Sequence, residues 1–102
     1  MLQKFSKGYY LRTYWVRLTD ESRNAEINDA EYASLKEGLY ENVPIVMKMH
    51  NNHFTVTGDK NVSSQTLEIG RDFISDERYR RNPFKKNVFV AKPSVIRNIY
   101  TI

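Results

Sequence analysis

Hydrophobic and polar residues alternate along several stretches of the chain, which predicts a domain built largely of β-strands. The longest stretch is Tyr9–Thr19, where aromatic and β-branched residues occupy parts of both faces. Shorter stretches of similar character cover residues 25–27, 43–50, 53–57, 64–69 and 87–91. Asn51–Asn52 suits a two-residue hairpin turn, because Asn tolerates the positive φ that such turns require.

Two helices are predicted between these strands. The first begins after Asn28 or Asp29, either of which suits an N-cap, and Glu31 is spaced as a capping-box partner of Asn28. Gly38 is placed to end this helix. Its apolar face would consist of Tyr32, Leu35 and Leu39. The second helix is predicted over 71–81, and the residues after it form one further strand and an apolar tail that is expected to dock on the body.

The order strand, strand, helix, strand occurs twice, which indicates an internal repeat with a period near 40 residues. Each unit alone is too small to bury its apolar face, so the two are expected to pack side by side. The predicted fold class is α+β: two repeated strand–strand–helix–strand (ββαβ-like) units packed into one small domain over 1–102. The first unit covers about 9–50, the second about 53–93, and the C-terminal tail is 94–102. Chance agreement is the alternative, because strand–helix–strand order is common.

Composition excludes several classes of protein. The chain has 102 residues and no cysteine, which excludes a disulfide scaffold, a cysteine-ligated metal site and a thiol nucleophile. No apolar stretch is long enough to span a membrane, and the first residues lack the apolar segment of a secretory signal. We therefore expect an intracellular protein without a membrane partner. Hydrophobic residues are 40% of the chain, which is enough for one core.

Positive charge is concentrated in the second half of the chain. The formal net charge is +4, and residues 1–51 are neutral because seven basic residues balance seven acidic ones. Such an excess attracts polyanions or an acidic protein partner, and the alternative is an ordinary solvated helix end. The candidate polyanion-binding residues are Arg78, Arg80, Arg81, Lys85 and Lys86.

The sequence contains no recognisable catalytic constellation, so we expect neither an enzyme nor a cofactor. The P-loop, the Gly-rich dinucleotide motif and the nucleophile elbow are missing. His50 and His53 flank the predicted turn and would face each other across the hairpin, with Asp59 as a third candidate ligand. Because a metal site needs three or four ligands in a defined geometry, an exposed pair without metal is the expectation.

Several short motifs resemble a family of short uncharacterised haloarchaeal proteins. They follow the same order over most of the chain: Phe5-Ser6 with Gly8-Tyr9-Tyr10-Leu11, Pro44 with Val46-Met47-Lys48, His53-Phe54 with Val56 and Gly58-Asp59, Thr66-Leu67, and Arg81-Asn82-Pro83 with Ala91-Lys92. The whole chain also resembles a small protein of a filamentous virus of hyperthermophilic archaea (Acidianus filamentous virus). These resemblances imply a small viral or archaeal protein that acts in the host cytoplasm or in the virion, and they imply no catalytic residue.

The favoured hypothesis is a non-enzymatic interaction module. It would bind an extended peptide or protein segment, of the virus or of the host, in a groove between the two repeats. Main-chain pairing at a strand edge would supply affinity, and side-chain pockets would come from Tyr9, Tyr10, Trp15, His53 and Phe54. The alternative is a nucleic-acid-binding protein that uses the basic residues within 78–86. A structural subunit of a virion, which would self-associate, is a third hypothesis.

Overall fold

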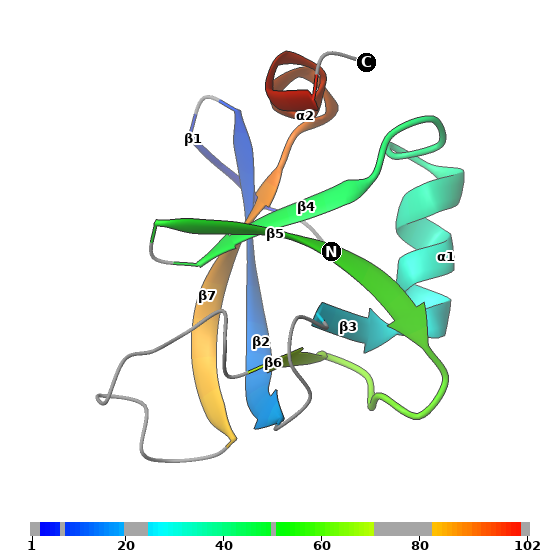
Figure 1. The fold of residues 1–102 in the computed structure, drawn as a ribbon, viewed down its shortest axis with the longest axis vertical. Helices are drawn as coiled ribbons and strands as arrows, with labels where there is room; N and C mark the ends of the chain where they lie inside the picture. Colours follow the sequence, from blue (N-terminus) through cyan, green and yellow to red (C-terminus); the bar gives the residue numbers. More distant parts are fainter. Residues whose placement is uncertain (1–2, 7, 20–24, 50, 71–82, 101–102) are drawn as a thin grey trace.

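Six strands close into a barrel in the computed structural model, and a seventh strand extends the sheet beside one of them (Figure 1). The structure describes residues 3–6, 8–19, 25–49, 51–70 and 83–100. The elements are β1 (Gln3–Ser6), β2 (Tyr9–Thr19), β3 (Ala25–Asn28), α1 (Asp29–Glu37), β4 (Ile45–Met49), β5 (Asn52–Asp59), β6 (Thr66–Gly70), β7 (Phe84–Ala91) and α2 (Pro93–Tyr100). Around the barrel the order is β2-β6-β3-β5-β4-β7, and β7 pairs again with β2.

The longest strand, β2, matches the prediction for Tyr9–Thr19 at both ends. Its second half alternates as a barrel strand should: Tyr14, Val16 and Leu18 are buried, while the residues between them are exposed. One edge of β2 pairs with β7 from Tyr9 to Val16. The opposite edge pairs with β1 at its start and with β6 at its end, so this single strand connects most of the sheet.

Helix α1 begins as the sequence predicts. The Oδ1 of Asn28 accepts hydrogen bonds from the backbone N–H groups of Ala30 at 3.0 Å and Glu31 at 3.2 Å, which is the N-cap geometry. The expected return bond of a capping box is replaced, because the carboxylate of Glu31 binds Arg12 of β2. The prediction that Leu39 lies on the apolar face was wrong: α1 ends at Glu37 with Gly38 as its C-cap, and 51% of Leu39 is exposed.

The two predicted units do not pack side by side. Strand β2 of the first unit lies between β6 and β7 of the second, and β5 lies between β3 and β4 of the first. The pairing scheme is unchanged when β2, β3 and β4 are exchanged with β5, β6 and β7. The strands are interleaved, because each pairing among β2 to β7 joins a strand of one unit to a strand of the other and so covers strand edges that each unit alone would leave open. The fold is therefore one small, strand-dominated domain, and the helix predicted over 71–81 lies outside the described residues.

The β4–β5 hairpin is shifted from its predicted register. Met49 pairs with Asn52, and Lys48 pairs with His53, so Asn52 is already part of the strand. His53 therefore faces Lys48 instead of a second histidine, and His50 lies outside the described residues.

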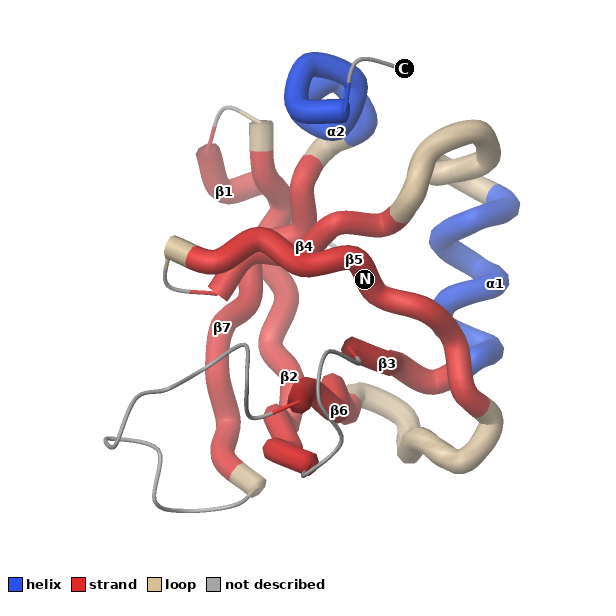
Figure 2. The backbone as a smooth tube through the Cα atoms, in the orientation of Figure 1, coloured by secondary structure: helices blue, strands red, loops and turns tan. Residues whose placement is uncertain are grey.

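Helix α2 accounts for the apolar tail. Ile96 is fully buried, and Val95 packs against the core, which confirms the expected docking. In the tube view, α1 lies along one side of the barrel next to β3 and β5, and α2 lies at the end where β7 finishes (Figure 2). Gly8, whose φ is +91°, lies against α2, since a Cβ added to it would be 2.5 Å from Cγ2 of Val95.

Candidate functional site

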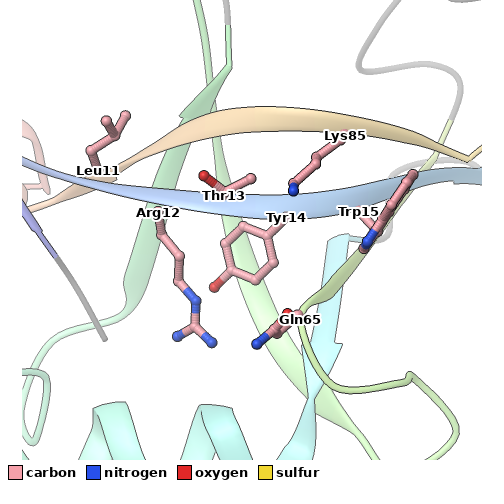
Figure 3. Close-up of a pocket in the computed structure, with 7 residues that line it drawn as sticks. All are labelled: Leu11, Arg12, Thr13, Tyr14, Trp15, Gln65 and Lys85. Carbon is pink, nitrogen blue, oxygen red and sulfur yellow. The ribbon is translucent and has the colours of Figure 1, made fainter.

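A cleft of about 310 Å³ opens along the middle of β2 (Figure 3). Its position follows from the way in which one edge of β2 is paired. On that edge, β1 pairs with β2 up to Leu11, and β6 pairs with it from Trp15 onward. Between these two pairings, no strand in the described part of the chain pairs with that edge at residues 12–14. The cleft is lined by Leu11, Arg12, Thr13, Tyr14, Trp15, Gln65 and Lys85.

Arg12, which lines the cleft, forms an ion pair with Glu31 of α1. Nη2 of Arg12 lies 2.5 Å from Oε2 of Glu31, and the two side chains are 13% and 15% exposed. The same carboxylate accepts the backbone N–H of Gln65 at 3.0 Å. Glu31 therefore joins the helix, the strand and the loop before β6, and a second hollow, of about 420 Å³, opens on the α1 side of the ion pair.

The loop residue Gln65 is held in a left-handed conformation with φ of +61°. An L-residue adopts this region only when its surroundings compensate the cost. Two backbone hydrogen bonds do so, because Gln65 donates to Glu31 and its carbonyl accepts the N–H of Trp15 at 2.8 Å. This conformation brings Gln65 to the mouth of the cleft.

Tyr14 contributes a buried hydroxyl. Only 1% of the residue is exposed, and the hydroxyl has no hydrogen-bond partner among the residues that the structure describes. The guanidinium of Arg12 lies over its ring, 5.0 Å from the centroid. Burial raises the pKa of Tyr14 to about 12, with a smaller contribution from the charge of Glu31 and an opposing one from Arg12. The hydroxyl is therefore neutral near pH 7 and can donate a hydrogen bond.

The end of the cleft combines an aromatic ring and a cation. Trp15 is 47% exposed, and Lys85, its partner across the β2–β7 pair, is also exposed. Trp15 is the single tryptophan of the chain. Large aromatic side chains with exposed faces are common anchors in protein interfaces.

The residues predicted for partner binding lie in different parts of the molecule. Tyr9 and His53 meet, with 2.8 Å between the tyrosine hydroxyl and Nε2, and Lys48 lies over the Tyr9 ring at 5.4 Å. Phe54 is only 3% exposed and belongs to the core. Tyr10 is covered by Lys92, 5.3 Å from its centroid. None of these four residues lines the cleft at Trp15.

The candidate polyanion-binding residues are described only in part. Lys85 lines the cleft, and Lys86 follows it on β7 as a half-buried residue. Arg78, Arg80 and Arg81 lie outside the described residues. Sequence reasoning did not select Arg12, Tyr14 or Gln65, because the pairing of Arg12 with a helix 19 positions away leaves no local pattern.

The described residues contain no group of three or more His, Cys, Asp or Glu side chains that could hold a metal ion. None of the helices among them has the length and apolar character needed to cross a membrane. Asp59, the third ligand considered, accepts the backbone N–H of Asn61 at 2.8 Å, which lowers the pKa of its carboxyl.

Comparison with known proteins identifies a family for this chain. A family model described as "Family of unknown function (DUF5802)" matches residues 1–102. No curated protein and no solved structure matches the chain.

Proposed function

This chain belongs to the DUF5802 family of unknown function, and we propose that it is a non-enzymatic module that binds an extended, acidic protein segment in the cleft beside β2. The proposal relocates the binding groove. Because the strands of the two halves interleave, the segment would not lie in a seam between repeats. It would lie along the β2 edge between β1 and β6.

The observation that carries the proposal is the gap in pairing on that edge. An extended segment can add to a strand edge through main-chain hydrogen bonds, and residues 12–14 are the part of β2 that no described strand pairs on this side. This gap is short, so main-chain pairing alone would bind weakly. Side-chain contacts, above all with the half-exposed Trp15, must supply much of the affinity.

The preference for an acidic segment follows from the charges around the cleft. Arg12 and Lys85 are positive, and Glu31 offsets one of these charges. A segment with one acidic side chain would match the remaining positive charge, and electrostatic complementarity of this kind favours the correct partner and speeds association.

Nucleic-acid binding is the second candidate. Its support is that Trp15 of β2 is paired with Lys85 of β7, and that Lys86 follows Lys85 along β7. A ring beside cations can stack a base and contact phosphates. The described cleft supplies little net charge for a polyanion, so this candidate depends mainly on Arg78, Arg80 and Arg81. Its signature is steep salt dependence, with a log–log slope of about -0.9 for each phosphate contacted on duplex DNA.

Trp15 allows both candidates to be tested without a label. Its fluorescence is recorded during titration with a short acidic peptide and with single- and double-stranded DNA and RNA, each at low and moderate salt. We expect a change with the peptide that persists at moderate salt. The variant Trp15→Ala, studied by calorimetry, should lose binding while remaining folded. Leu39→Ala removes the other large exposed apolar side chain, 51% exposed, and should bind as wild type. Equal loss in both variants, or binding only to nucleic acid, would reject the peptide proposal.

Two finer expectations remain proposals. We infer that the barrel derives from two ββαβ-like units, and the exchange symmetry of the strand pairing supports this. Separately produced fragments 1–51 and 52–102 should then be unfolded alone and fold when mixed. The archaeal and viral setting, with an intracellular or virion location, stays a prediction from the sequence motifs.

A further inference from the structure

We propose that the cleft beside β2 contains a carboxylate subsite formed by the hydroxyl of Tyr14 and the guanidinium of Arg12. Lys85, which pairs with Trp15 and so stands on the outer face of the sheet, adds positive charge to the cleft without entering the subsite. The inference rests on the proposed function, because it names the chemical group of the bound segment that the cleft recognises. That group is the carboxylate of an aspartate or glutamate side chain.

The first support is the hydroxyl of Tyr14. A buried hydroxyl without a partner costs free energy, and a phenylalanine of nearly the same shape would avoid that cost. Tyr40, the other large buried tyrosine, donates to the backbone carbonyl of Ala91 at 2.6 Å. Tyr14 has no equivalent partner in the described ranges, although its residue lines the cleft. A ligand oxygen in the cleft would complete it.

The second support is the direction of the side chains. The guanidinium of Arg12 and the hydroxyl of Tyr14 extend from β2, and the side chain of Gln65 extends from the loop before β6, toward the same space (Figure 3). Glu31 takes one N–H of Arg12 through Nη2. A guanidinium has five N–H donors in a fixed plane, so Arg12 can hold Glu31 and a second carboxylate together.

The third support is the charge balance, which selects the kind of anion. Arg12 and Lys85 carry two positive charges, and Glu31, in contact with Arg12, carries one negative charge. A single carboxylate makes the group neutral. A phosphate dianion would leave excess negative charge next to Glu31, and like charges at such range repel. The cleft should therefore prefer a carboxylate to a phosphate.

The test uses paired peptides and the full-length protein. Two short, blocked peptides of alternating threonine and valine differ only in a central aspartate or asparagine, and Trp15 fluorescence reports binding. We expect the aspartate peptide to bind roughly tenfold or more tightly than the asparagine peptide, because a charge-assisted hydrogen bond is lost with the amide. Tyr14→Phe should remove most of that preference, and Lys85→Gln, which removes only a positive charge at the edge of the cleft, should reduce it by less. Lys60→Gln, which removes an exposed lysine from the turn after β5, should leave it unchanged.

The outcomes separate this inference from the proposed function. Equal binding of the two peptides, or an unchanged preference in Tyr14→Phe, would overturn the subsite while leaving a peptide-binding cleft. If neither peptide binds but acetate alters Trp15 fluorescence in the wild type and not in Tyr14→Phe, the subsite stands and the ligand is a free carboxylate. Inorganic phosphate that binds more tightly than acetate would overturn the charge argument. A circular dichroism spectrum that matches wild type confirms that Tyr14→Phe is folded.

Discussion

Arg12 of β2 and Glu31 of α1 form a largely buried ion pair that also holds the backbone of Gln65. This ion pair links the position of α1, which lies outside the barrel, to the shape of the cleft beside β2. A charged group whose partner is removed stays buried without compensation, so this contact should matter for stability as well as for binding.

We predict that Glu31→Gln lowers the free energy of unfolding by about 1–2 kcal/mol, because Arg12 loses a partner in a partly dry site while the hydrogen bond to Gln65 can persist. Urea denaturation measures this change. Glu37→Gln, on the exposed last turn of the same helix, serves as the control and should change stability by less than about 0.5 kcal/mol. Similar losses in both variants would mean that the ion pair is not the cause.

The two buried tyrosines should respond oppositely to the loss of a hydroxyl. Tyr14→Phe should leave the free energy of unfolding unchanged or raise it by up to about 1 kcal/mol, because the lost hydroxyl has no described partner. Tyr40→Phe should lower it by about 1–3 kcal/mol, because the buried carbonyl of Ala91 loses the donor that lies 2.6 Å away. The two variants are compared in one set of denaturation curves. A clear destabilisation by Tyr14→Phe would show that its hydroxyl has a partner within the chain.

Stability should fall at alkaline pH. Burial raises the pKa of Tyr14 to about 12, from an ordinary value near 10, and raises that of Tyr40 further. A raised pKa in the folded state means that stability is complete below the unfolded pKa and is lost as pH rises through the folded value. Tyr14 should thus contribute a loss of up to about 3 kcal/mol between pH 10 and 12. Denaturation curves across this range should show a smaller loss in Tyr14→Phe, and an equal loss in that variant would exclude Tyr14 as a cause.

Gly8→Ala should destabilise the contact between the start of β2 and α2. An added Cβ would lie 2.5 Å from Cγ2 of Val95, and φ of Gly8 is +91°, so backbone strain and a steric clash combine. We expect a loss of roughly 2–3 kcal/mol in the free energy of unfolding. Gly38→Ala is the matched control, because its Cβ would meet Ser34 only at 3.5 Å, an ordinary contact. Equal tolerance of both changes would argue against this docking of α2.

The local features of the fold were accessible to sequence reasoning because they depend on neighbours in the chain. Alternation placed the long strand at Tyr9–Thr19, and the short polar side chain of Asn28 marked the start of α1. The apolar tail predicted a docked segment, which the buried Ile96 of α2 confirms. In each case, the hydrophobic period, the capping chemistry or the composition of a few neighbouring residues is sufficient to predict the element.

The closure of the barrel and the cleft were decided by tertiary structure. Sequence order suggested two adjacent units, but in the barrel the strands of each unit pair with strands of the other, and one short edge of β2 between β1 and β6 is left over. The same closure brings Arg12 to Glu31, whose carboxylate also binds the backbone of Gln65 at its positive φ, and it leaves Trp15 exposed beside Lys85. Alternation along the chain determined which residues enter the core. Only the pairing of distant strands determined which residues surround the cleft, because contacts across the barrel join positions that no local pattern relates.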